Sequence, residues 1–337
     1  NPFRRRTAGP DRLPLLTGGT FQPWSPLRPS TEWVEAPSAD PSSGIGSQLW
    51  HLANLQSPEC GFVMGVQQNL HVRHRLRGTW YDRDSSSSFA FTHSVWRVQS
   101  LPKQSDALRA LLALLNSDLV NFLFSAWSTN FNVGQAQIFR LPCPTTPLPA
   151  SDLNSAALSA LAARSDIENW ELSGRGSYKP GHLSVDPEQV LSTLGIPKVS
   201  LSDALLSGDL LVEQGSSGRI DRIINENRLS STTPGYAEAV GPLLLAAGPA
   251  AQLVAASASV SLPRVDRLAE WDRAINVALE TAQGYVGAFD TAQEDVNSSV
   301  SSWYGLSAGQ RAVAARGLPW AYKRARRRHK QLNPQTP

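Results

Sequence analysis

Three arginines recur at every second position in the segment 70–77. They are Arg73, Arg75 and Arg77. Alternate side chains of a β-strand point to the same face, so the segment is predicted to be a strand with one basic and one mainly apolar face. Guanidinium groups pair with phosphate oxygens or with the acceptor edge of guanine. The spacing therefore favours contact with a nucleic acid.

Uncharged amides follow in the loop predicted after Trp127. Asparagine and glutamine pair with the N6/N7 edge of adenine, and arginine with phosphate or guanine. The candidate DNA-contacting residues are Arg73, Arg75, Arg77, Asn130, Gln135, Gln137 and Arg140. The alternative interpretation is a solvated strand face and an uncommitted surface loop.

Two other patterns carry weaker chemistry. His71 and His74 could begin a metal site, but the two cysteines of the chain do not supply further ligands at a suitable spacing, so no metal site is predicted. Asp82 and Asp84 could act with Lys103 as a nuclease centre. Their position in a serine-rich turn favours plain solvated charge instead, and no residue is predicted to be catalytic.

A long apolar helix must position the amide loop. Leucine and phenylalanine recur at spacings of three and four from Leu108 to Leu123, which predicts one continuous helix. Ser105 is its predicted cap, and Asp106 complements the helix dipole. Residues 138–142 are predicted to form a short strand after the loop.

Two separated motifs resemble one protein family. The first is Leu114-Leu115-Asn116-Ser117 followed by Phe139-Arg140-Leu141-Pro142-Cys143-Pro144, and the second is Tyr304-Gly305-Leu306-Ser307. In this order they resemble the C-terminal target-recognition region of N6-adenine DNA methyltransferases, namely the type IIG and TaqI-like restriction-modification enzymes and their phage-defence relatives. The chain departs from the family pattern at Trp303, where a leucine is usual, and at residues 309–311, where an acidic cluster is usual.

The resemblance implies sequence-specific recognition of double-stranded DNA as the specificity part of such a methyltransferase. Catalysis would need an Asn/Asp-Pro-Pro-Tyr/Phe loop and a glycine-rich turn for S-adenosylmethionine. Asn1-Pro2-Phe3 lacks the second proline, and Gly44-Ile45-Gly46 follows no predicted strand. The chain is therefore expected to hold no cofactor, and S-adenosylmethionine is expected on a methyltransferase catalytic domain in cis or in trans. The alternative is a non-catalytic structural or adaptor protein that docks a partner through its helical half.

The length of 337 residues and the hydrophobic content of 41% predict two domains with a substantial core. The predicted fold class is α+β, with a mixed strand and helix DNA target-recognition domain followed by a mainly helical C-terminal region. The longest predicted helix covers residues 264–289, and its apolar stripe, which includes Trp271, should pack against other helices. The expected parts are an extended lead-in (1–45), a target-recognition domain (46–150), a helical region (151–320) and a basic tail (321–337).

The net charge of +3 is small, but the six Lys or Arg and two acids between residues 62 and 103 give that piece a charge of +4. The tail residues 323–330 are expected to be a disordered arm that binds phosphate or keeps the protein in solution. No apolar run reaches the roughly 18–20 residues of a membrane span, and the two distant cysteines favour a reducing compartment. A cytoplasmic protein without membrane contact is expected.

Overall fold

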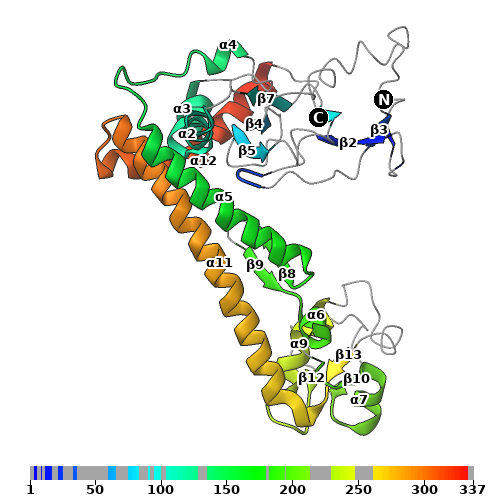
Figure 1. Ribbon diagram of the computed structural model, residues 1–337. Coiled ribbons are helices and arrows are strands. Elements are labelled where there is room, and N and C mark those ends of the chain that lie inside the picture. The colour runs from blue at the N-terminus through cyan, green and yellow to red at the C-terminus, as the bar shows by residue number, and fades with distance from the viewer. Residues whose placement is uncertain are drawn as a thin grey trace. The chain divides into compact units, whose positions relative to one another are not determined.

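A computed structural model divides the chain into two compact units. The first unit contains Asn1–Asp166 and Gly287–Pro337, and the second contains Ile167–Val286. Helices combine with small sheets in both (Figure 1), a mixture consistent with the predicted α+β class. The described residues are 4–5, 9, 12–16, 22–25, 33–35, 60–65, 75–82, 90–91, 95–99, 104–127, 135–179, 182–193, 195–212, 229–246 and 261–332.

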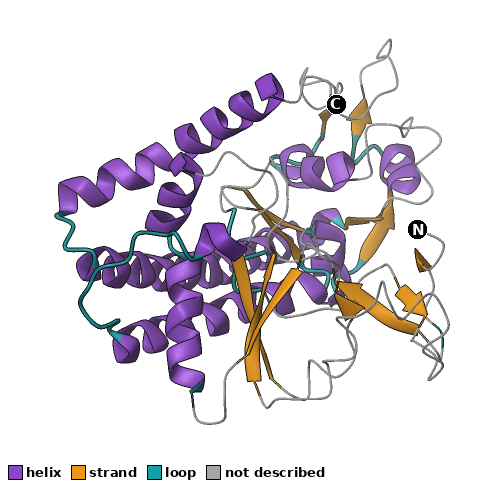
Figure 2. Cartoon of the chain, turned by 90° about the horizontal axis from the view of Figure 1, so that it is seen from above, coloured by secondary structure: helices purple, strands orange, loops and turns teal. Residues whose placement is uncertain are grey.

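The first unit contains a three-stranded antiparallel sheet, whose strands lie side by side in Figure 2. Its central strand β4 (Cys60–Gly65) pairs with β5 (Arg77–Asp82) on one side and with β7 (Val95–Gln99) on the other. A second sheet has the order β1-β3-β2-β6, and its β2–β6 pair is parallel. Its strands are β1 (Arg4–Arg5), β2 (Arg12–Leu16), β3 (Trp33–Glu35) and β6 (Ala90–Phe91).

The helix predicted to run through residue 123 is two helices, α2 (Ser105–Asn116) and α3 (Asp118–Trp127), bent by 58°. The chain is extended at Ser117, whose hydroxyl donates to the carbonyl of Leu114 (2.7 Å) and accepts from the N–H of Val120 (3.3 Å). Ser117 thus satisfies the ends of both helices. The predicted cap was wrong, because Gln104 precedes α2 and makes no side-chain capping bond.

Two fully buried asparagines join this corner to the outer edge of β5. Asn116 accepts from the N–H of Gly78 (2.7 Å) and donates to its carbonyl (2.9 Å). Asn121 accepts from the N–H of Leu76 (2.8 Å) and donates to the carbonyls of Leu115 and Ser117 (both 3.0 Å). This pair of asparagines, the amide clamp, satisfies backbone groups that an edge strand and a helix break would otherwise leave unpaired.

The C-terminal helix pair is fastened to the same corner. These helices are α11 (Leu268–Trp303), whose last part belongs to the first unit, and α12 (Ala308–Leu332). Gln293 donates to the carbonyl of Asn116 (3.4 Å) and accepts from the indole N–H of Trp24 (2.8 Å). Asn297 accepts from the N–H of Asp118 (2.9 Å) and donates to its carboxylate (3.3 Å). Residues about 180 positions apart therefore share one polar network.

Helix α12 lies against α3. Ala314, Leu318 and Ala321 recur at spacings of four and three and are buried. At Gly317, a Cβ atom would lie 2.8 Å from the ring of Phe122, so the two helices approach too closely for a larger residue there. The predicted disordered tail is wrong in its backbone, because α12 continues to Leu332.

The second unit is a set of short elements around its own core. Its strands pair as three antiparallel two-stranded ribbons, β8–β9, β10–β13 and β11–β12. The strands are β8 (Gly176–Lys179), β9 (His182–Val185), β10 (Lys198–Ser200), β11 (Leu211–Val212), β12 (Leu229–Ser230) and β13 (Ser261–Pro263). The helices described within it are α6 (Pro187–Thr193), α7 (Leu201–Ser207), α9 (Tyr236–Ala246) and the 3-10 turn η2 (Val265–Arg267).

The apolar stripe predicted on the longest helix is confirmed at Trp271. This side chain is 2% exposed in the core of the second unit, and its indole N–H donates to the carbonyl of Ala239 (3.3 Å). Helix α11 extends further in the C-terminal direction than predicted, to Trp303, and α5 covers Ala150–Leu172. Both helices run across the boundary between the units, so the predicted domain limits at 150 and 320 differ from the observed division.

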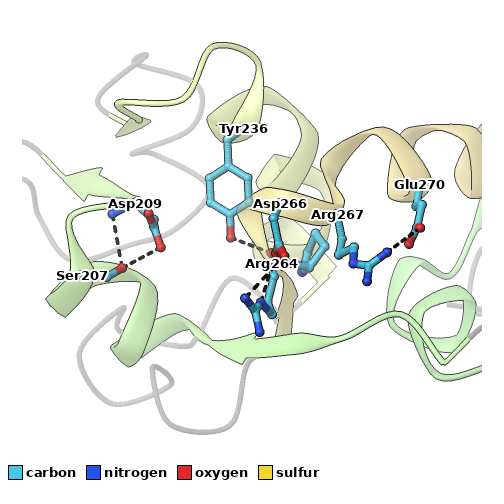
Figure 3. Close-up of polar contacts among 8 residues, drawn as sticks. Ser207, Asp209, Tyr236, Arg264, Asp266, Arg267 and Glu270 are labelled. Carbon is cyan, nitrogen blue, oxygen red and sulfur yellow. Dashed lines mark hydrogen bonds and ion pairs between the residues drawn. The ribbon is translucent and has the colours of Figure 1, made fainter.

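Tyr236 fastens α9 to the end of β13 (Figure 3). Its hydroxyl donates to the carbonyl of Pro263 (2.8 Å), and its side chain is fully buried. Burial raises the pKa of Tyr236 to about 12, and the negative charge of Asp209 adds to the shift. Nearby, Arg264 pairs with Asp266 (3.0 Å) and Arg267 with Glu270 (2.7 Å), but both pairs are exposed and contribute little to stability.

Within the described residues, no single helix combines the length and apolar composition of a membrane span. Only the bent α2–α3 pair meets both requirements, and only when its two helices are taken together.

The amide clamp predicts a specific loss of stability. Replacing Asn116 with alanine leaves the buried N–H of Gly78 without its acceptor, so the Asn116→Ala change should cost about 2–4 kcal/mol in the free energy of unfolding. Gln104→Ala removes an exposed amide beside the same helix and should change it by less than about 0.5 kcal/mol. Urea-induced unfolding of the full chain measures both, and equal costs would contradict a structural role for the clamp.

Tyr236 predicts a loss of stability at high pH. Since the pKa of Tyr236 is about 12 when folded and about 10 when unfolded, its contribution is complete below pH 10 and disappears as the pH rises through 12. Tyr236→Phe should cost about 1 kcal/mol at pH 7, because the bond to Pro263 is lost. The variant should lose less stability than the wild type between pH 9.5 and about 11.5. Urea unfolding at several pH values tests this, and parallel pH profiles would refute it.

Candidate functional site

Two candidates of the amide loop, Gln137 and Arg140, lie on one short turn of the first unit. Residues 137–141, the interface turn, include the end of α4 (Gln135–Ile138). Ile138 and Leu141 pack against the core, and the N–H of Leu141 donates to the carbonyl of Ile138 (3.0 Å). Phe139 and Arg140, which lie between these two anchors, are both exposed, Phe139 by 77%. The local fold therefore projects one aromatic and one cationic side chain into solvent.

The chain after the interface turn is held by the end of α11. The hydroxyl of Tyr304 donates to the carbonyl of Pro142 (2.7 Å), and the indole N–H of Trp303 donates to the carbonyl of Thr146 (3.1 Å). The two rings meet edge to face with centroids 5.3 Å apart. Burial raises the pKa of Tyr304, with Cys143 beside it, so the hydroxyl stays protonated as a donor.

A shallow cleft of about 520 Å³ lies next to this junction. It is lined by Thr146, Pro147, Pro149, Asp152, Ser298, Ser299, Ser302 and Trp303. The one ionisable group in this lining is the carboxylate of Asp152. The cleft therefore does not complement phosphate, and the cationic candidates lie elsewhere in the first unit.

Arg75 lies against α3. Its guanidinium group stands over the ring of Phe124, 4.9 Å from the centroid, and the side chain is half-buried. A cation held over an aromatic ring keeps its charge while losing part of its rotational freedom. Arg75 is therefore positioned at the surface of the α2–α3 corner, close in sequence to the clamped backbone of Leu76.

Arg77 corrects the predicted basic face. The strand begins at Arg77 and does not end there, and this side chain is 1% exposed. It shares its face with Thr79 and Tyr81, which are also buried, and the hydroxyl of Thr79 donates to the carbonyl of Ser25. Because the segment around Ser25 covers this face, Arg77 does not present its charge to solvent. Burial lowers the pKa of its guanidinium to about 10.

The other predicted residues divide into two groups. Arg73 and Asn130 lie outside the described residues. Gln135 begins α4, and Gln137 is half-buried on the same helix. The strand predicted over residues 138–142 was wrong, since this stretch is the end of a helix and a turn. Gln137 and Arg140 are thus brought together within the interface turn.

Two exposed aromatic residues of the first unit were not predicted as part of a site. Phe139 is the more exposed, and Trp127, at the end of α3, is 48% exposed. Trp127 lies four residues after Leu123 and continues the apolar spacing of the helix, so the sequence contained no signal that this residue would be exposed. Large aromatic side chains that stay exposed beside an arginine are typical of interaction surfaces.

The described residues of the site offer binding groups. In the part of the chain that the structure describes, no group of three or more His, Cys, Asp or Glu side chains could hold a metal ion. The arrangement of the interface turn provides hydrogen-bond donors, one positive charge and an exposed ring, which together suit recognition of a polar, anionic surface. No protein-family model, curated protein or solved structure matches the chain.

Proposed function

We propose that this chain recognises specific sequences in double-stranded DNA, as the specificity part of an adenine-N6 methyltransferase of a restriction-modification or phage-defence system. The methyltransferase catalytic domain and S-adenosylmethionine would be supplied in cis or in trans. One observation carries the proposal. The two motifs behind the family resemblance lie 162 residues apart, and they meet through the hydrogen bond from Tyr304 to Pro142.

The interface turn supports the proposal by its chemistry. Arg140 can bind a phosphate or the O6/N7 edge of guanine, and the Gln137 amide can pair with adenine. Phe139 can contact a thymine methyl group or enter between base steps. The turn is anchored on both sides by Ile138 and Leu141, and such anchoring keeps reading groups in one geometry.

The adaptor alternative is less well supported. It depends on an apolar helical face that is free to dock a partner. Trp271, the largest side chain of the predicted stripe, is 2% exposed and already belongs to the core of the second unit. A partner could not use Trp271 without opening this core.

The proposal predicts different effects for charged and uncharged residues of the turn. The wild-type chain should enrich a preferred sequence from a randomised duplex pool. Arg140→Gln should weaken binding to all duplexes and reduce the salt slope by about one unit, the change expected for one lost phosphate contact. Gln137→Ala should leave the slope unchanged and cost about 1–3 kcal/mol on the preferred duplex alone. Affinities are measured at several salt concentrations.

Arg273→Gln is the matched control, because Arg273 is an exposed cation of the second unit. It should change neither the salt slope nor the enriched sequence. If the wild-type chain enriches no sequence, the recognition proposal fails. If Arg273→Gln weakens binding as much as Arg140→Gln, the interface has been assigned to the wrong unit.

A further inference from the structure

We infer that the C-terminal half of α12 is a second DNA-binding element, which holds phosphates without reading sequence. The choice of duplex DNA as the partner rests on the proposed function. The inference itself concerns a different part of the first unit, and it begins with the distribution of charge. From residue 308 onward the sequence contains eight Lys or Arg and no acid, whereas the whole chain has a net charge of +3. The rest of the chain therefore carries a net charge of −5.

The basic residues lie on regular helix. Six of the eight residues from 323 to 330 are Lys or Arg, and α12 includes all of them. A helix rises 1.5 Å per residue, so these charges fall within about 12 Å, or roughly one per 2 Å. Duplex DNA carries about one phosphate charge per 1.7 Å of its axis. The two charge densities are similar and opposite in sign.

The helix also contains a repulsion that a polyanion would relieve. Three pairs of like charges have the spacing i, i+4, namely Lys323 with Arg327, Arg324 with Arg328, and Arg326 with Lys330. Such pairs destabilise a helix, and no acid in this part of the sequence offsets them. Phosphates along the helix would replace this repulsion with attraction.

The packing of α12 fixes the basic half to the unit that carries the interface turn. Ala314 and Leu318 are buried, and the close approach of Gly317 to Phe122 anchors the helix on α3. On the other side, Arg316 and Lys323 are exposed, four residues before and three residues after the 57% exposed Trp320. Two cations and a ring are therefore exposed on the described part of the helix that precedes the basic residues 324–330 of the sequence.

The same packing argues against a membrane surface as the partner. A basic helix that lies on a membrane inserts an apolar face between the lipids. The regularly spaced apolar residues of α12, which include Leu318 and Ala321, are already buried within the protein. The described exposed face carries Arg316 and Lys323 beside Val313 and Trp320. Residues 323–330 contain six Lys or Arg and no large apolar residue, so a rigid polyanion is the better complement.

The test uses the full chain and a triple variant, Arg326→Gln with Arg327→Gln and Arg328→Gln. Binding to a scrambled 30-base-pair duplex is followed by fluorescence anisotropy between 0.05 and 0.3 M salt. The variant should bind at least 10-fold more weakly at about 0.1 M salt, and its salt slope should fall by two to three units, at about 0.9 per lost phosphate contact. The ratio of affinities for the preferred and scrambled duplexes should stay unchanged.

A matched triple variant removes the same charge from exposed arginines of the second unit, Arg264→Gln with Arg267→Gln and Arg273→Gln, and should keep the wild-type slope. Circular dichroism identifies any variant that fails to fold. If the α12 triple variant does not fold, the single variant Arg327→Gln tests the inference instead, and its salt slope should fall by about one unit. An unchanged slope in the α12 variants overturns the inference even if a preferred sequence exists. A reduced slope without any preferred sequence keeps the inference and refutes the proposed function. If the α12 triple variant loses binding to anionic vesicles or to RNA but keeps its binding to duplex DNA, the inference is also overturned.

Discussion

The first unit depends on how the exposed edge of β5 is closed. A sheet edge normally leaves backbone groups for water or for another strand. Here Asn116 and Asn121 occupy that edge with side chains that imitate a neighbouring strand, and both amides come from the point where α2 ends and α3 begins. The bend between the helices and the closure of the sheet are therefore one feature. Trp24 adds a third bond at Gly78 (2.9 Å) while holding a positive φ of 66°, a conformation that surrounding contacts must stabilise.

The network extends from this corner to the surface that we assign to DNA. Gln293 and Asn297 attach the end of α11 to the corner, and two turns later Tyr304 holds the chain that leaves the interface turn. Helix α12 follows directly and packs on α3. The interface turn and the basic helix are thus supported by one core, although their residues are far apart in the sequence. In the proposed function, the turn would supply amide, aromatic and arginine groups for reading, and the helix would supply charge for attraction.

The sequence was most informative where a pattern was regular and local. The apolar spacing predicted that the residues of α2 and α3 are helical, although not the break between them, and it predicted the burial of Trp271. Prediction from the sequence failed where contacts between distant segments determine the structure. Arg77 alternates with other arginines as an exposed strand residue would, but the segment near Ser25, about fifty residues earlier, covers it. The asparagines of the clamp lie on an apolar helix face, and their partner strand could not be deduced from helical spacing alone.

The central claim is that the first unit carries the DNA interface, with reading at the turn and attraction at α12. Hydrogen exchange of the full chain, free and saturated with duplex, tests it most directly. With the preferred duplex, exchange should slow at residues 135–142 and along α12, and remain unchanged in α9 of the second unit. With a scrambled duplex at equal occupancy, exchange should slow along α12 as before, and at residues 135–142 it should slow less than with the preferred duplex. Protection confined to the second unit, or no protection at saturation, would contradict the claim.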